Sequence, residues 1–261
     1  MTMKIKVATY LGLLFYLSIV ASISVVSDFD LWVTIILFFG LPSIWLLWLL
    51  RPPVSLFLPV AISALATTLL FESIAYSSGL WYELSDFQVR MFGVFPLEIF
   101  FWNFATQLLI IAVHEYFSDD RLINEVRINW KNIWLLGFLV LLAVIGVLFV
   151  TTMSRVVLPF AAWWLLAGAV VSLGGAMIFS HTSSRAVIKK AGLTTLLMLP
   201  ILLIHELVSL FSFHWVFANP AQYLASINIA GELYPVERFL FILLIPLWII
   251  VVYESYLDDS A

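Results

Sequence analysis

Cysteine is absent from this sequence of 261 residues, and charged side chains make up only 11% of it. The absence of cysteine excludes disulfides, thiolate metal sites and a cysteine nucleophile. The shortage of charge excludes a soluble domain of this length, which needs roughly 25% charged residues to cover its surface. Lipid must therefore be the solvent for most of the chain.

Further absences narrow the functional classes. The net charge of −4 and the lack of a basic stripe give no basis for a nucleic-acid partner. No glycine-rich nucleotide loop follows a strand, which fits chemistry without a redox cofactor. The four histidines, at positions 114, 181, 205 and 214, have no metal-ligand spacing, so no metal site is predicted.

Hydrophobic residues, by contrast, supply 64% of the chain and aromatic residues 16%, and the mean hydropathy is +1.10. An apolar run of about 20 residues can cross a bilayer as a helix. Because β-barrel alternation is missing, the sequence predicts an all-α polytopic membrane bundle of about eight transmembrane helices. The runs are residues 7–26, 31–50, 54–71, 95–113, 133–152, 157–179, 191–211 and 234–253.

Lysine and arginine are distributed unevenly over the linkers between these runs. When successive linkers are placed on alternate sides of a membrane, nine of the twelve basic residues fall on one side. Basic residues are enriched in cytoplasmic linkers. The pattern therefore predicts an integral protein of the cell (inner) membrane with both termini in the cytoplasm.

Two blocks of sequence recur in the two halves of the chain. Each block has a glutamate, a tryptophan nine residues later, and then a Pro-x-Glu motif that opens an aromatic-rich run. The linker between tryptophan and proline is five residues longer in the second half. This predicts a tandem duplication of a four-helix unit, residues 1–131 and 132–261, with a two-fold axis along the membrane normal. The matched residues are Glu72, Trp81, Pro96 and Glu98 in the first half and Glu206, Trp215, Pro235 and Glu237 in the second.

The matched glutamates have two interpretations. A glutamate at the end of a membrane helix often only reaches toward the headgroups, and a glutamate in a first turn complements the helix dipole. Ionisable residues within spans, however, indicate a functional site, and here they recur in both copies. Glu115 and Glu254, at the cytoplasmic ends, are expected to be solvated.

At these residues the sequence resembles the lycopene cyclase domain family of flavin-independent membrane cyclases. The resemblance covers about residues 54–117 and 191–256. It implies a tandem-repeat membrane fold and a carotenoid cyclase, an intramolecular lyase or isomerase without net redox or cofactor. It also implies an apolar polyisoprene or carotenoid substrate that enters from membrane lipid. The second acid of each family motif is replaced here, by Ile99 and by Arg238.

Ring closure of a polyene needs a proton donor, stabilisation of a cation and a base. Desolvated carboxyl groups keep their protons, and aromatic faces stabilise cations by about 0.5–2 kcal/mol each. We expect Glu98 and Glu237 to be catalytic, supported by Glu72 and Glu206. Arg238 is expected to reach Glu98 or Glu206 across the repeat interface and hold it ionised as a base. The substrate-binding candidates are Arg238 and the aromatic residues Trp81, Phe100, Phe101, Trp102, Trp215, Phe239 and Phe241.

Two other functions fit the same pattern. Tandem repeats with acidic residues in the membrane are also typical of transporters of small molecules or lipids. A non-catalytic membrane subunit of a carotenoid-pathway complex would tolerate loss of the carboxylates at Glu98 and Glu237. Assembly with copies of itself or with other enzymes of such a pathway is left open.

Overall fold

The computed structural model describes residues 3–79, 81–83, 89–91, 95–118, 134, 137–138, 140–142, 144–145, 184–217, 219–229 and 231–256. Within these ranges, five helices are long and apolar enough to cross a membrane: Met3–Ser27, Leu31–Leu50, Val54–Ala75, Leu97–Ser118 and Ile188–Phe211. The chain is thus an integral membrane protein with a polytopic helical fold. The predicted span 157–179 lies outside the described residues, and span 133–152 is described only at eight helical positions.

The first two spans are α1 (Met3–Ser27) and a composite helix of α2 (Leu31–Ile35), a π-helical turn η1 (Ile36–Gly40) and α3 (Leu41–Leu50). The Asp30 carboxylate starts the second span by accepting a 2.8 Å hydrogen bond from the backbone N–H of Val33. The π turn lies just before Pro42, which has no N–H to continue the regular ladder. Sequence alone therefore sets both where this span begins and where it is irregular.

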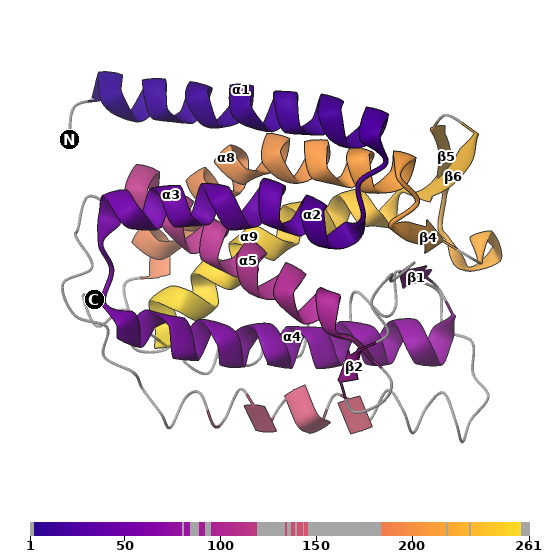
Figure 1. Cartoon of the computed structure of the whole chain (residues 1–261). Helices are drawn as coiled ribbons and strands as arrows, with labels where there is room; N and C mark the ends of the chain where they lie inside the picture. Colours follow the sequence, from indigo (N-terminus) through magenta and orange to yellow (C-terminus); the bar gives the residue numbers. More distant parts are fainter. Residues whose placement is uncertain are drawn as a thin grey trace.

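The remaining helices are η2 (Val54–Leu56) with α4 (Phe57–Ser78), α5 (Leu97–Val113) with the π turn η3 (His114–Ser118), α8 (Ser184–Phe211) and α9 (Glu237–Tyr256). α4 ends at Gly79, whose φ of +62° suits glycine and whose N–H bonds the Ala75 carbonyl at 2.9 Å. α5 is the central helix, in contact with α3, α4, α8 and α9 (Figure 1). α1 lies at the edge of the bundle against α8.

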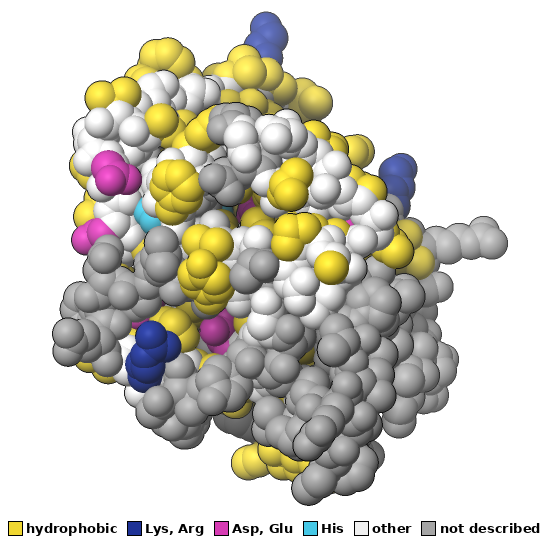
Figure 2. Space-filling view, turned by 90° about the vertical axis from the view of Figure 1, so that its right-hand side faces the viewer, with side chains coloured by type: hydrophobic (Ala, Val, Ile, Leu, Met, Phe, Trp, Pro, Cys, Tyr) yellow, Lys and Arg dark blue, Asp and Glu magenta, His cyan; other side chains and the backbone are white. Residues whose placement is uncertain are grey.

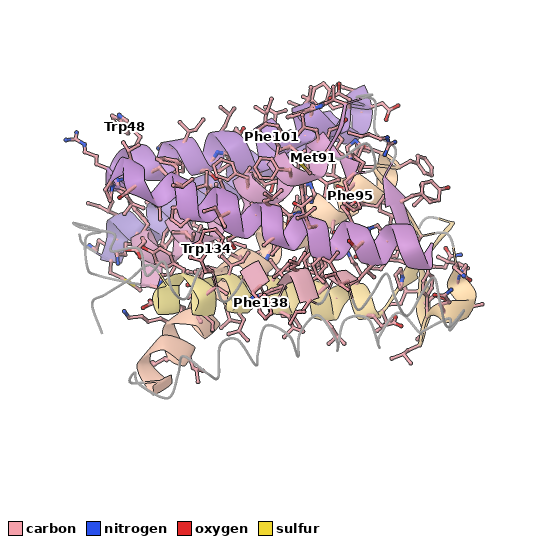
Figure 3. The ribbon with its side chains drawn as sticks, turned by 90° about the horizontal axis from the view of Figure 1, so that it is seen from below. Trp48, Met91, Phe95, Phe101, Trp134 and Phe138 are labelled. Atoms are coloured by element: carbon pink, nitrogen blue, oxygen red, sulfur yellow. The ribbon has the colours of Figure 1, made fainter. Side chains whose placement is uncertain are left out.

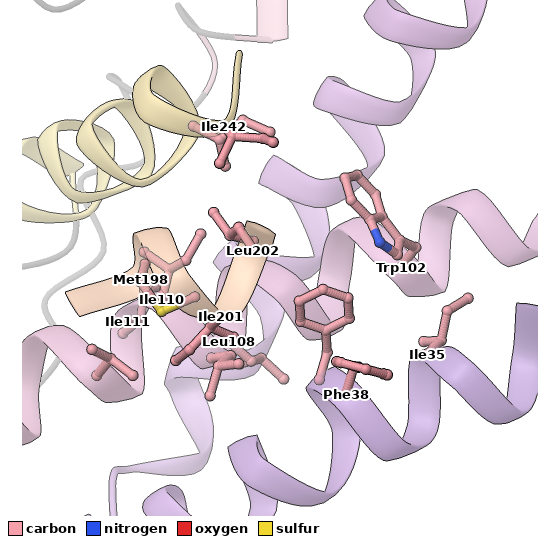
Figure 4. Packing of buried hydrophobic residues seen from close by; sticks show 14 of the residues in the cluster. Ile35, Phe38, Trp102, Leu108, Ile110, Ile111, Met198, Ile201, Leu202 and Ile242 are labelled. Carbon is pink, nitrogen blue, oxygen red and sulfur yellow. The ribbon is translucent and has the colours of Figure 1, made fainter. Parts of the chain in front are cut away.

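The core and the outer surface are both apolar. Side chains from α2, η1, α5, α8 and α9 interdigitate in one continuous cluster, part of which Figure 4 shows. On the outside, large hydrophobic side chains such as Trp48, Trp134 and Phe138 are exposed (Figure 3). Such a surface is stable only against lipid, where hydrocarbon replaces water around the helices.

Three short antiparallel ribbons lie at one end of the bundle, opposite the first turn of α1 (Figure 1). They pair β1 (Trp81–Glu83) with β4 (Trp215–Phe217), β2 (Arg90–Met91) with β3 (Phe95–Pro96), and β5 (Ser226–Ile229) with β6 (Glu232–Pro235). The sequence predicts an all-α chain, with β1, β2, β4 and β5 in linkers and with β3 and the end of β6 at the starts of the spans 95–113 and 234–253. Runs of two to four paired residues are too short to show a strand period, whereas their backbone groups still gain partners by pairing.

Candidate functional site

All four matched glutamates are buried at the ribbon end of the bundle. Glu72 near the end of α4 is 4% exposed, Glu98 at the start of α5 is 0%, Glu206 in α8 is 5%, and Glu237 at the start of α9 is 2%. A carboxyl group that only reaches toward lipid headgroups would be exposed at its tip. Burial therefore removes the interpretation of these residues as simple interfacial anchors.

Glu206 forms a buried ion pair with Arg238. Arg238 Nε donates to Glu206 Oε1 at 2.7 Å and Arg238 Nη2 donates to Oε2 at 3.2 Å, which is the bidentate geometry of a carboxylate and a guanidinium. The Tyr234 hydroxyl donates to Glu206 Oε1 at 2.9 Å. The sequence predicts that Arg238 reaches Glu98 or Glu206 across the repeat interface. It reaches Glu206, but this pair joins α8 and α9 within the second half.

The guanidinium of Arg238 also faces two aromatic rings. Its Cζ atom lies 4.3 Å from the centroid of Phe241 and 5.8 Å from that of Trp215. Burial and the Glu206 carboxylate together raise the pKa of Tyr234, so its hydroxyl stays protonated and remains a donor. The result is a fixed cluster of one cation, one anion, one phenol and two aromatic faces.

A small cavity lies beside this cluster. Its volume is about 20 Å³, enough for one water molecule. Side chains of both halves line it, from α4, β1, α5, β4 and α9. They are Phe71, Glu72, Trp81, Ile99, Trp102, Asn103, Trp215, Phe217, Arg238 and Phe241.

A wider groove of about 280 Å³ borders the cavity, and the two share Trp215 and Phe217. The other groove residues lie at the end of α8, in β4 and around the β5–β6 ribbon, and most are apolar. Figure 2 views this end of the molecule, where hydrophobic side chains are spread over the surface with few charged ones among them. The groove is lined by Leu210, Phe213, Trp215, Val216, Phe217, Pro220, Gly231 and Leu233.

Six of the twelve predicted site residues line the cavity itself. They are Glu72, Trp81, Trp102, Trp215, Arg238 and Phe241. Glu206 joins the site through Arg238, and Phe239 through its ring contact with Tyr234 at 5.3 Å. Phe100 and Phe101 do not line the cavity, because they pack with Phe104 and Trp32 on another face of α5.

Glu237 holds the loop before the β5–β6 ribbon. Its Oε1 accepts from the backbone N–H of Leu224 at 2.5 Å, and the Val236 N–H bonds the carbonyl of Ala225 at 3.0 Å. Burial and the Glu237 carboxylate raise the pKa of Tyr223 in this loop to about 12, against the opposing hydrogen bond from Asn219. The structure thus gives Glu237 a loop contact rather than a place at the cavity.

Several polar residues near the site were not predicted. Asn103 Nδ2 donates to Thr68 Oγ1 at 2.9 Å, and Gln107 Nε2 donates to Thr67 Oγ1 at 3.0 Å, which joins α5 to α4. His205 is buried, with its ring centroid 4.5 Å from Phe39. Two amide side chains one turn apart in an apolar run predict a polar contact with a neighbouring helix, because polar groups inside a membrane span need hydrogen-bond partners.

The opposite end of the bundle corrects another expectation. Glu115 and Glu254 were expected to be solvated, but Glu115 is 5% exposed and Glu254 Oε1 lies 2.7 Å from His114 Nε2. His114 Nδ1 lies 2.9 Å from Thr194 Oγ1. The π turn η3 places these groups between α8 and α9, where a regular linker would have left them in water.

The fold and the site define a polytopic helical membrane protein with a small cavity lined by Glu72, Arg238 and aromatic side chains. Comparison of the chain with known protein families, with curated proteins and with solved structures gives no match. In the described ranges, no group of three His, Asp or Glu side chains is placed to hold a metal ion.

Proposed function

We propose that the protein is a membrane-embedded cyclase that closes rings at the ends of a carotenoid-type polyisoprene by acid–base chemistry. The observation that carries this proposal is the cavity, where the Glu72 carboxyl and the Glu206–Arg238 pair meet aromatic rings of both halves. An adjoining groove with mostly apolar lining residues shares Trp215 and Phe217 with the cavity. The resemblance to lycopene cyclases at the same residues supplies the substrate class.

In the proposed reaction, Glu72 in its neutral form donates a proton to the terminal double bond. The electron pair of that bond forms a C–H bond and leaves a tertiary cation. A second double bond attacks the cation and closes the ring by a new C–C bond. The Glu72 carboxylate left by the first step then removes a neighbouring proton and becomes the acid again, so atoms are conserved and no electrons are gained or lost.

The protein's main contribution to this reaction is to surround the carbocation with buried aromatic rings that stabilise its positive charge. Trp81, Trp102 and Trp215 line the cavity and are neutral, so they stabilise positive charge without trapping it. Arg238 neutralises Glu206, so that carboxylate cannot capture the proton from Glu72 without breaking two hydrogen bonds. The two copies would therefore have different roles, with the acid from the first.

A duplication of residues 1–131 as 132–261 is part of the same proposal. Trp81 recurs as Trp215, and the ribbon pairs Tyr82 with Val216, its equivalent 134 positions later. An antiparallel pair centred on equivalent residues is what a two-fold axis between the halves would give. The matched pairs Trp81 and Trp215, Ile99 and Arg238, and Trp102 and Phe241 all line the cavity, which supports an axis near it.

For orientation, we propose the cell (inner) membrane with both termini in the cytoplasm and the ribbons outside. The excess of lysine and arginine on the other linkers supports this orientation. Reporter fusions after Lys131 and after Lys190 should report cytoplasm, and a fusion after Ala221 the outside. An external signal after either lysine would reverse the assignment.

Expression in a bacterium that accumulates lycopene tests the function directly. We expect ring products of the same mass as lycopene, with absorption bands at shorter wavelength, because the double bond left in the ring is twisted out of the plane of the conjugated chain. Cells that express Glu72→Gln at equal membrane level should keep their lycopene. Unchanged lycopene with the natural sequence would overturn the cyclase proposal in favour of a transporter or a non-catalytic subunit.

A further inference from the structure

Two buried tryptophans meet at the wall of the cavity. Trp102 of α5 and Trp215 of β4 are 6% and 5% exposed, and their ring centroids lie 5.6 Å apart with the planes at 77°. Both line the cavity together with Glu72 and Asn103. Figure 4 shows Trp102 as part of the packed core cluster. In the described part of the chain, neither indole N–H has a hydrogen-bond acceptor.

Buried donors of this kind are nearly always satisfied, by the protein or by ordered water. A water molecule needs a cavity of roughly 10–15 Å³ and two to four polar partners. The cavity has about 20 Å³. Trp102 and Trp215, whose indole N–H groups lack acceptors, are among its lining residues, and the oxygens of Glu72 and Asn103 can accept from a water in turn. The wall therefore has the size and the chemistry of a site for one water molecule.

We propose that this cavity is a water subsite and that the protein has a second activity, hydration of the terminal double bond of its substrate. The proposal rests on the proposed function, because both products come from the same tertiary cation. Water in the cavity lies beside the carboxyl group that protonates the alkene. It competes with the second double bond for the cation.

The hydration step balances without any oxidant or reductant. Glu72 gives its proton to one alkene carbon, and the alkene electron pair forms that C–H bond. A lone pair of the water forms a C–O bond to the tertiary carbon. The oxonium then returns one proton to the Glu72 carboxylate, which regenerates the acid. The net change is the addition of one H2O to one double bond, with a tertiary alcohol as product.

The volume of the cavity favours capture by water. Ring closure requires the chain end to fold back on itself, whereas one water molecule already fits the cavity. Water needs no such rearrangement, because the indole N–H groups would hold it with its lone pairs defined. Alcohol should therefore be a substantial product of the chain as it stands.

Mass analysis of the pigments separates the possible results. Membranes that carry the protein are incubated with lycopene in water labelled with oxygen-18. The masses of the products are then measured by mass spectrometry. A product heavier than lycopene by one labelled water supports hydration. Ring products of unchanged mass alone would overturn the water subsite and leave the cyclase intact. Unchanged lycopene would overturn both.

Tryptophan variants test whether the indole N–H groups hold the water. Trp102→Phe and Trp215→Phe keep an aromatic ring but lose the donor. Each should lower the share of alcohol among converted products by about fivefold, the factor for one ordinary hydrogen bond. Trp48→Phe, on the exposed face of α3, is the matched control and should leave the share unchanged. If both cavity variants leave the share of alcohol unchanged, the indole N–H groups do not hold the water and the proposed subsite is wrong. If a variant fails to fold, the oxygen label in the natural protein still tests whether water is added.

Discussion

At the residue scale, Arg238 gives the matched glutamates Glu72 and Glu206 different surroundings. It neutralises Glu206 through two hydrogen bonds, while Ile99 occupies the equivalent position in the first half. A hydrophobic side chain at that position cannot neutralise Glu72. Under the proposed function, this difference accompanies a division of roles, with Glu206 held in an ion pair and Glu72 as the proton donor.

Loss of the Glu72 carboxyl should remove turnover and leave the fold intact. Gln keeps the shape and can still form hydrogen bonds, but it cannot donate a carboxyl proton. General acid catalysis is typically worth 10²–10⁴-fold, so Glu72→Gln should lower the rate of lycopene conversion by at least about 100-fold. The measurement is product yield at equal protein level.

The matched variants rank the other glutamates in the same assay. Sequence alone predicts the largest losses for Glu98→Gln and Glu237→Gln, whereas only Glu72 of the four lines the cavity. We expect smaller losses for Glu237→Gln, which mainly weakens the loop contact to Leu224. Equal activity of Glu72→Gln and the natural protein would refute the assignment of the acid.

Removal of Arg238 should destabilise the protein strongly. Arg238→Met leaves Glu206 as a buried charge without its cation, which costs about 3–5 kcal/mol. The double variant Arg238→Met with Glu206→Leu removes both charges and should recover most of that loss. Thermal unfolding in detergent measures the difference. Arg51→Met, at the exposed end of α3, is the control and should change little. If Arg238→Met is as stable as the double variant, the unpaired Glu206 carboxylate does not destabilise the protein and the prediction is wrong.

At the element scale, the π turn η3 connects the ends of three helices. His114 on η3 contacts Thr194 of α8 and Glu254 of α9, at 2.9 and 2.7 Å. Lys190 of α8 lies 4.0 Å from the same Glu254. α5 is the central helix of the bundle. The His114 cluster joins its C-terminal end to α8 and α9, whereas the cavity lies near its N-terminal end.

His114→Ala should therefore lower stability without touching the chemistry. Hydrogen bonds to charged groups contribute about 1.5–3 kcal/mol, and the variant leaves Glu254 with Lys190 alone in the described part of the cluster. We expect a lower unfolding temperature in detergent with the alcohol-to-ring ratio unchanged. His214→Ala, whose ring lies 2.8 Å from the carbonyl of Phe29 at the ribbon end, is the matched control for loss of a buried histidine. A changed product ratio in His114→Ala would link the far end to the site.

Most of the helical fold could be read from the sequence, because an apolar run of about 20 residues has few alternatives in a membrane. Among the described residues, six predicted spans recur as helices, of which 31–50 keeps its ends and the other five have shifted ends. α4 runs to Ser78 instead of residue 71, which places Glu72 inside a helix. Hydropathy could not give that end, since the helix continues through polar residues up to Gly79. Pairing partners such as Glu206 with Arg238 depend on how α8 and α9 pack, which no sequence spacing fixes.

At the scale of the whole molecule, the β1–β4 ribbon is where the two halves meet outside the helices. Its register pairs Trp81 with Phe217, Tyr82 with Val216 and Glu83 with Trp215. The ribbon also carries both tryptophans of the repeated motif, and both line the cavity. The site is complete only when the halves are paired in this register, because a slip by one residue would turn these side chains to the opposite face.

A cross-link can test that register, because the chain has no cysteine of its own. Directly opposite residues of an antiparallel pair have Cα atoms about 4.5–5.5 Å apart, within the range that a disulfide bridges. Tyr82→Cys with Val216→Cys should therefore oxidise to a disulfide in membranes. After cleavage at a protease site inserted behind Lys131, the two fragments should migrate together on a gel without reductant and separate with it. Tyr82→Cys with Phe217→Cys differs by one residue, points its thiols to opposite faces and should not cross-link. If Tyr82→Cys cross-links with Phe217→Cys instead, the register differs by one residue and Trp81 and Trp215 cannot both line the cavity. The proposal that the two halves form one site would then be wrong.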